Sequence, residues 1–124
     1  NKAGVFRTEE YMTEALKELD EIEAKLNDFK VADKSSVYNL ELIEALELNN
    51  MVMVSKAATK AALLRKESRG GHSREDYPER DDKEYLKHTN ATLSSDGKDI
   101  EITYRPVRLQ PLTVESFPPK PRVY

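Results

Sequence analysis

The chain has 124 residues, enough for one small domain, and its 20 Lys plus Arg against 23 Asp plus Glu give a formal net charge of −3. This balance leaves no basic footprint for nucleic acid, and the lack of cysteine excludes disulfides, thiol nucleophiles and Cys-ligated metal centres within these residues. No stretch approaches about 18 consecutive apolar residues, so no membrane-spanning helix is predicted. The sequence does not begin with Met, as expected of a piece of a longer or processed protein.

A first amphipathic helix is predicted over residues 9–29. Thr8 is a suitable N-cap, and Glu9 and Glu10 lie where the positive end of the helix dipole favours acidic side chains. Apolar residues recur at steps of three and four, which indicates a single buried face. This seam consists of Met12, Ala15, Leu19, Ile22, Leu26 and Phe29.

A second helix is predicted to begin after the turn residues 33–36, with Asn39 as an alternative cap, and to run to about Glu67. Its middle, residues 51–54, spreads apolar side chains around about 300° of the helix, so more than one face must be buried. The second face could be covered by a third helix, by a hydrophobic dimer contact or by a domain that these residues do not include, and the sequence leaves these alternatives open. The main apolar face is Leu42, Ile43, Leu46, Met53, Ala57, Ala61 and Leu64.

The remaining elements are predicted from turn residues. Gly70 and Gly71 are expected to end the second helix, since glycine readily adopts the left-handed backbone of a C-terminal cap. Asp96-Gly97 between the alternating runs 89–94 and 99–104 predicts a β-hairpin. Prolines then predict an extended tail over the last twenty residues, ordered only where it lies on another surface.

Residues 65–82 alternate four arginines with six carboxylates. One interpretation is a solvated charged loop; the other is a polar interface in which carboxylates of this chain or of a partner hold each arginine bidentately. His72 and Asp76 would share a helix face as metal ligands, but the flanking glycines and Pro78 disfavour a helix there. No nucleophile elbow, phosphate loop or dinucleotide fingerprint occurs, so the sequence predicts no catalytic or cofactor site of its own.

The same segment, Arg-Lys-Glu-Ser-Arg-Gly-x-His-x-Arg-x-Asp-x-Pro-x-Arg-Asp-Asp, resembles the signature of the C-terminal domain in succinate dehydrogenase and fumarate reductase flavoproteins. Residues 4–10, 44–51, 85–89 and 117–124 are similar to that family in the same order. Gly71 stands where the family commonly has Ala, and Tyr85 where Trp or Phe is frequent. L-aspartate oxidases share the Glu-Ser-Arg-Gly-x-His core but usually lack the Arg-Asp-Asp block and the Pro-Pro tail, which favours the dehydrogenase side.

We therefore predict an all-α fold class: an antiparallel helical hairpin or three-helix bundle-like domain with a small C-terminal β-hairpin and an extended tail. Residues 1–71 are the predicted helical hairpin, and residues 72–124 are the charged loop, β-hairpin and Pro-rich tail of the same domain. The resemblance implies that the first helix of the family's bundle lies partly upstream of Asn1. The second helix would then keep an uncovered face, through which the isolated chain is expected to self-associate.

The resemblance also implies a parent protein that interconverts succinate and fumarate by hydride transfer at FAD. The parent would lie at the cytoplasmic inner face of a membrane, with an iron–sulfur partner subunit. In that family the catalytic and FAD-binding residues lie N-terminal to this domain, so none carries over. The alternative is a free-standing helical-hairpin interaction module. What carries over from the family is an interface role. The residues expected to hold this domain against the FAD-binding domain of the same chain or against the iron–sulfur subunit are Arg69, His72, Arg74, Asp76, Arg80, Asp81 and Asp82.

Overall fold

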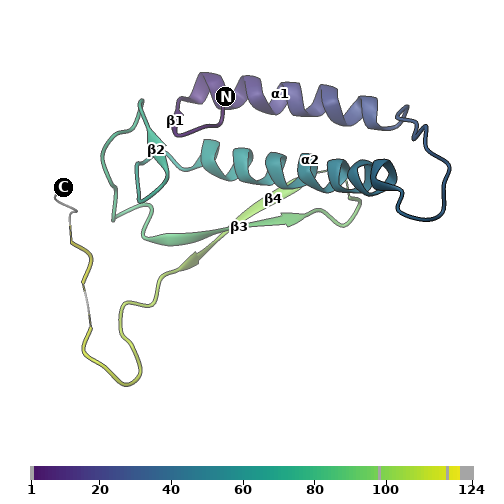
Figure 1. Ribbon diagram of the computed structural model, residues 1–124. Coiled ribbons are helices and arrows are strands. Elements are labelled where there is room, and N and C mark those ends of the chain that lie inside the picture. Colours follow the sequence, from purple (N-terminus) through teal and green to yellow (C-terminus); the bar gives the residue numbers. More distant parts are fainter. Residues whose placement is uncertain (1, 98, 117, 121–124) are drawn as a thin grey trace.

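The computed structural model describes residues 2–97, 99–116 and 118–120 (Figure 1). Two antiparallel helices lie side by side, and a β-hairpin crosses the second of them on the side away from the first (Figure 1). The second helix is therefore the middle layer. In chain order the elements are β1 (Phe6–Arg7), α1 (Glu9–Leu26), α2 (Leu40–Leu64), β2 (Ser73–Arg74), β3 (Lys87–Leu93) and β4 (Ile100–Pro106).

The predicted all-α fold class is wrong, because two small β-sheets accompany the two described helices and make the domain mixed α/β. The layer that covers the second face of α2 is the antiparallel hairpin β3–β4 and not a third helix. Alternate strand residues face the helix, and Ile100 at the start of β4 is only 5% exposed. The predicted hairpin around Asp96-Gly97 is confirmed, and Gly97 adopts the positive φ of 72° that its turn requires.

The second sheet joins β1 to β2 in parallel and was not predicted. Phe6 lies opposite Ser73, and Arg7 lies opposite Arg74. Two-residue strands are too short to show any alternation, and these two are separated by the whole helical hairpin. Their pairing holds the segment before α1 against the segment that follows α2.

Helix α1 begins and packs largely as predicted. The Thr8 hydroxyl accepts a hydrogen bond from the Tyr11 amide at 3.2 Å, which confirms the N-cap. Met12 is fully buried and Ala15 is buried beside it, whereas Ile22 and Phe29 at the far end are largely exposed. The seam is therefore used mainly near the start of the helix, and the helix ends at Leu26, three residues before the predicted boundary.

Helix α2 begins where predicted and ends early. The Asn39 side chain accepts from the Leu42 amide at 2.8 Å, so the alternative cap is the real one. The prediction that Gly70 and Gly71 end this helix is wrong. The last helical residue is Leu64, and Arg65 is already extended, with φ −89° and ψ 101°. The end of the helix is stabilised instead by side chains that arrive from later in the chain.

The first half of α2 keeps an uncovered apolar face, as expected. Leu46 is 63% exposed, and Leu42 and Ile43 beside it are also exposed. The hairpin is linked to the second half of the helix, for example by the Lys60–Asp99 ion pair, and Val52 near the middle is buried. Self-association of the isolated chain through this face stays a prediction, to be tested by light scattering.

The tail after β4 contains no helix or strand within the residues that the structure describes, up to residue 120. It runs away from the body and returns beside residues 65–82 (Figure 1). There the Arg80 guanidinium donates to the Lys120 carbonyl at 2.9 Å. Residues 117 and 121–124, part of the ending that resembles the family, lie outside the described residues. Among the described helices, neither has the length and apolarity that a bilayer crossing requires.

Candidate functional site

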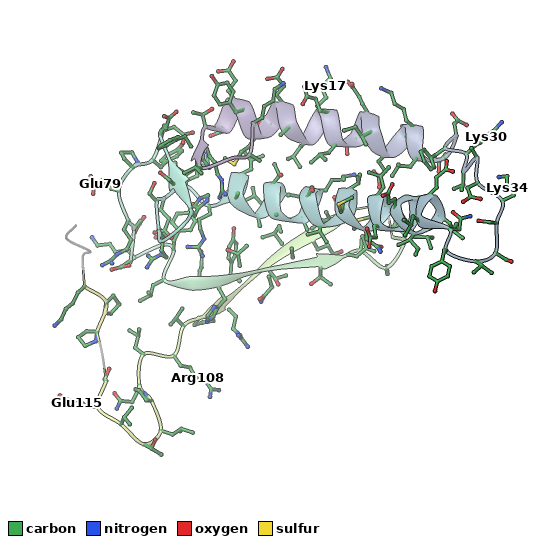
Figure 2. The ribbon with its side chains drawn as sticks, viewed as in Figure 1. Lys17, Lys30, Lys34, Glu79, Arg108 and Glu115 are labelled. Carbon is green, nitrogen blue, oxygen red and sulfur yellow. The ribbon has the colours of Figure 1, made fainter. Side chains whose placement is uncertain are left out.

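We call residues 65–82 the charged strip. It begins at the end of α2, folds back past β1 and the start of α1, and leads into β3 (Figure 1). Most helix-borne charges, such as Lys17, point into solvent, and Glu79 lies at the outer margin of the strip (Figure 2). The strip is different because its arginines turn inward and are paired.

Arg74 is almost completely buried, with 1% of the residue exposed. Its Nε and Nη2 atoms each donate to one carboxylate oxygen of Asp76 at 2.7 Å, a bidentate pair. Its remaining amino group, Nη1, donates to three carbonyls at the end of α2, those of Ala62 (3.2 Å), Leu63 (3.0 Å) and Arg65 (3.2 Å). The guanidinium therefore supplies the donors that the last turn of α2 lacks.

Asp76 extends the same pair to the other helix. Its Oδ2 atom accepts from the amide of Glu9, the first residue of α1, at 2.8 Å. A cation thus lies at the negative end of α2 and an anion at the positive end of α1, and both placements are favourable. The Arg74–Asp76 pair joins the two helices at the end opposite their connecting loop.

The pairing of Asp76 predicts an acid-dependent loss of stability. The hydrogen bonds from Arg74, with help from the Glu9 amide, lower the pKa of Asp76 to about 2 from its ordinary value of 3.8. Since the folded pKa is the lower one, the contribution is complete above the ordinary value and is lost as pH falls from there toward about 2. We expect Asp76→Asn to flatten the dependence of the urea midpoint on pH in this window. An unchanged slope would contradict the assignment.

Glu67 is the centre of a second network and is fully buried. It accepts from the Arg65 guanidinium, from Arg69 Nε at 2.8 Å and Nη2 at 3.0 Å, and from the Asp81 amide at 2.8 Å. Burial alone would raise the pKa of Glu67, but the hydrogen bonds from Arg69, the Asp81 amide and Arg65 outweigh it and lower the pKa. This carboxylate is therefore held ionised between two arginines.

Arg65 connects the Glu67 network to the hairpin. Its guanidinium donates to the Tyr85 carbonyl at 2.9 Å, to the Lys87 carbonyl and to the Thr89 hydroxyl. It also lies 5.5 Å from the centroid of the Tyr85 ring. One side chain at the end of α2 thus fixes the start of β3, which explains how the hairpin is aligned under the helix.

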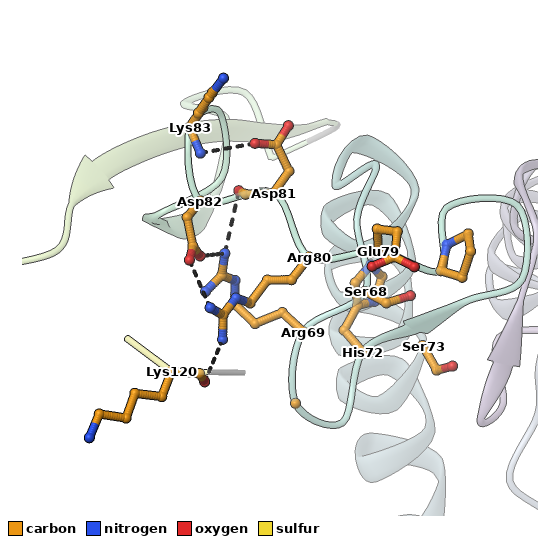
Figure 3. Close-up of a pocket in the computed structure, with 12 residues that line it drawn as sticks. Ser68, Arg69, His72, Ser73, Glu79, Arg80, Asp81, Asp82, Lys83 and Lys120 are labelled. Carbon is orange, nitrogen blue, oxygen red and sulfur yellow. Dashed lines mark hydrogen bonds and ion pairs between the residues drawn. The ribbon is translucent and has the colours of Figure 1, made fainter. Parts of the chain in front are cut away.

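The outer part of the strip is partly exposed. Arg69 Nη2 donates to Asp82 Oδ1 at 2.7 Å, and Arg80 Nη2 donates to Asp82 Oδ2 at 2.8 Å (Figure 3). Asp82 is thus shared by two arginines, whose side chains are 28% and 29% exposed. Asp81 contributes differently, because its Oδ1 atom accepts from the backbone amides of Lys83 and Glu84 and so stabilises a turn.

These residues border an open pocket of about 880 Å³ between the strip and the tail (Figure 3). Most of its lining residues are polar or charged, and the arginines Arg69 and Arg80 among them are already paired with Asp82. A flavin needs an apolar slot for its ring and a glycine-rich loop for its diphosphate. The described lining offers neither, so these residues do not fit an FAD site.

His72 lies in the tight turn that Gly70 and Gly71 make. Its backbone pairs with that of Arg69. Its Nδ1 atom lies 2.8 Å from Arg7 Nη1, and its Nε2 atom lies 3.2 Å from the Arg65 carbonyl. Residues 72–76 do not form a helix, so His72 and Asp76 do not share a helix face as metal ligands would. The His72 ring bonds to Arg7 and Arg65, and the Asp76 carboxylate bonds to Arg74 and to the Glu9 amide.

The two glycines of this turn offer a matched comparison. Gly70 has φ +58°, a left-handed conformation that costs other residues about 1–2 kcal/mol. Gly71 has no such φ, and a Cβ at either position would meet no atom within 4 Å. We expect Gly70→Ala to lower the free energy of unfolding by about 1–2 kcal/mol and Gly71→Ala to leave it within about 0.5 kcal/mol. Urea unfolding of both variants measures this, and equal losses would contradict it.

The structure brings the seven predicted site residues into one region but divides their tasks. Arg74 and Asp76 join the helix ends, Arg69, Arg80 and Asp82 form the outer network, and the other two stabilise turns. Their predicted role as an interface to another domain stays a prediction. Sequence reasoning did not single out Glu67, Arg65 or Arg7. Glu67 lies two residues from each of two arginines, and that spacing could have indicated it.

Comparison with known proteins gives one consistent family. The family described as "Fumarate reductase flavoprotein C-term" matches residues 1–124. The succinate dehydrogenase flavoprotein subunit of Rickettsia bellii is 44% identical over 98% of this chain and 21% of its own length. That of Coxiella burnetii is 46% identical over 96% of the chain and 19% of its own length. The fumarate reductase flavoprotein subunit of Mycobacterium tuberculosis is 37% identical over 98% of this chain and 20% of its own length.

Solved structures agree with this result. A variant of FrdA, from the quinol fumarate reductase of E. coli, matches with a TM-score of 0.82 and 34% identity over 92% of this chain and 19% of that chain. Adenylylsulfate reductase of Archaeoglobus fulgidus matches with a TM-score of 0.77 and 25% identity over 91% of this chain and 17% of that chain. The chain thus spans about a fifth of the length of the relatives it matches.

Proposed function

The chain belongs to the family of fumarate reductase flavoprotein C-terminal domains, and from this premise we propose that it is the structural domain of an enzyme that interconverts succinate and fumarate at FAD. The observation that carries the proposal is the match of that family over the whole chain. The named relatives, which are succinate dehydrogenase or fumarate reductase flavoprotein subunits, support it. In this proposal the FAD-binding part of the protein precedes the present residues.

The domain's own contribution is positional. Its buried charges are matched within the chain: Arg74 by Asp76, and Glu67 by Arg65 and Arg69. Hydrogen bonds hold Asp76 and Glu67 in the ionised form, so neither carboxylate is poised to exchange protons near neutral pH. FAD, bound elsewhere in the parent, would supply the hydride chemistry, and this domain would supply a rigid body beside it.

The surface that meets the rest of the enzyme is proposed to include the outer network of the charged strip. Arg69, Arg80 and Asp82 are partly exposed, so they can exchange contacts with the FAD-binding domain or with an iron–sulfur subunit. Arg74 has no exposed side-chain area and acts by positioning the strip. The parent is proposed to lie in the cytoplasm, at the inner face of a membrane, as a peripheral subunit.

Enzyme assays of the full-length protein that contains these residues test the proposed activity. Succinate-dependent reduction of an artificial electron acceptor, with co-purification of an iron–sulfur subunit, is the expected result. The same preparation is assayed for aspartate-dependent peroxide formation, which would assign the tail to an L-aspartate oxidase and overturn the proposal. A natural protein that consists only of these residues would favour the helical-hairpin interaction module instead.

A further inference from the structure

His72 is a half-buried imidazole whose hydrogen bonds define its protonation state. Its Nδ1 atom lies 2.8 Å from Arg7 Nη1, and an arginine guanidinium can only donate, so Nδ1 must be the acceptor. The proton of the neutral ring is then on Nε2, which donates to the Arg65 carbonyl at 3.2 Å. The contacts therefore require the neutral imidazole with its hydrogen on Nε2.

The charges that act most strongly on this ring are positive, although Glu79, Asp81 and Asp82 line the same pocket. Arg7 approaches from β1, Arg65 from the end of α2, and Arg74 from β2. The carboxylates that follow Arg65 and Arg74 are committed elsewhere, Glu67 to Arg65 and Arg69, and Asp76 to Arg74 and the Glu9 amide. Among the described residues no carboxylate lies within ion-pairing distance of His72. A proton on this ring would place a new positive charge against the Arg7 guanidinium, with no carboxylate of its own to balance it.

The location of His72 next to the paired strands β1 and β2 means that protonation of its ring would affect how the two strands are held together. The residue directly precedes β2, whose pairing with β1 holds the segment before α1. Arg7 is attached to the strip twice, by its side chain to His72 Nδ1 and by its carbonyl to the Glu75 amide at 2.9 Å. Protonation would convert Nδ1 from an acceptor to a donor and remove the first attachment.

We propose that His72 is an acid-operated latch that releases β1 from the segment after α2 when its imidazole takes up a proton from solvent. Arg7 then loses its acceptor and is repelled by the imidazolium, and the Arg7–Glu75 backbone bond opens more often. The Arg74–Asp76 pair and the packing of α1 on α2 stay in place, so the opening is local. Under the proposed function, the released segment is the one that joins this domain to the FAD-binding part.

The direction of the pH dependence follows from the same surroundings. Burial lowers the pKa of His72 below its ordinary value of 6.5, and Arg7, Arg74 and Arg65 lower it further, although the hydrogen bond to the Arg65 carbonyl opposes them. The unfolded or opened state therefore binds the proton more readily. The latch is fully closed above the ordinary value and opens as pH falls through the lowered pKa.

Nuclear magnetic resonance of the full chain with ¹⁵N-labelled histidine tests the latch without any enzymatic assay. The only other imidazole is that of exposed His88, and a His88→Asn variant assigns the two signals. At neutral pH we expect His72 in the Nε2–H form. As His72 takes up its proton, we expect the Glu75 amide to lose hydrogen-exchange protection severalfold, relative to the Ser94 amide of the hairpin, which bonds to Asp99.

His72→Asn is the matched variant, because the asparagine carbonyl can accept from Arg7 in place of Nδ1 but does not titrate. We expect the acid step in Glu75 protection to disappear in this variant. A persistent step would overturn the proposal, as would an Nδ1–H form at neutral pH or unchanged Glu75 protection when His72 is protonated. The last two readouts use the unaltered chain and decide the matter even if the variant does not fold. Loss of the latch would leave the proposed enzymatic function untouched.

Discussion

Replacing Arg74 by Met is expected to lower the free energy of unfolding by about 1–3 kcal/mol, because the change removes the buried partner of an ion pair and leaves carbonyls at the end of α2 without a donor. Methionine fills a similar volume but donates no hydrogen bond. The Asp76 carboxylate would lose its bidentate partner, and the carbonyls of Ala62, Leu63 and Arg65 would lose the donor that covers the end of α2. Urea unfolding at pH 7, followed by circular dichroism, measures the loss.

Arg80→Met is the matched control. It removes the same type of side chain from the same strip, but the Arg80–Asp82 pair is partly exposed, and such pairs contribute about 0–1 kcal/mol. Arg74→Lys separates charge from geometry, since lysine keeps the cation but cannot form the bidentate fork. If Arg74→Met costs no more than Arg80→Met, the helix ends do not depend on this guanidinium.

Local features of this fold could be predicted from the sequence. Thr8 and Asn39 cap their helices through amides three residues away, and Asp96-Gly97 makes its turn from its own backbone preferences. Each of these depends on a few neighbouring residues. They were therefore visible before any tertiary contact was known.

The features that could not be predicted all depend on contacts between distant residues. Glycine was expected to end α2 because it is the usual local solution. The actual end is stabilised by the guanidinium of Arg74, ten residues beyond Leu64, and nothing in the spacing of Arg74 indicates this. The parallel pairing of Phe6 with Ser73 is likewise invisible in two-residue segments. The all-α prediction failed because the cover of α2 was sought in a third helix, a dimer contact or a missing domain, although the hairpin that covers it had been predicted.

The charged strip shows the same limit at the level of single residues. Its alternating pattern left open a solvated charged loop and a set of ordered arginine–carboxylate pairs; the pairs exist, but the pattern does not say which partners meet. Asp82 is shared by Arg69 and Arg80, while Glu67 was not singled out and yet is the buried centre of a network. Burial decides the energetic weight of each pair, and burial arises from how the strip folds against α2.

The buried position of Glu67 makes it the second large test. Glu67→Gln is expected to cost about 3 kcal/mol, although the two side chains have nearly the same shape. The carboxylate accepts from Arg65, Arg69 and the Asp81 amide and donates to nothing. A glutamine amide in its place would turn its own N–H donors toward at least one of these donors and would leave two arginines without their shared anion.

The control and the pH dependence make this test specific. Glu75→Gln changes an exposed carboxylate of the same strip and is expected to stay within about 0.5 kcal/mol. Because the pKa of Glu67 is lowered in the folded chain, its contribution is complete above the ordinary value of 4.5 and is lost as pH falls through the folded pKa. The difference in unfolding free energy between the unaltered chain and Glu67→Gln should therefore shrink in acid. A difference that is constant with pH would mean that glutamine fails by packing and not by the loss of charge.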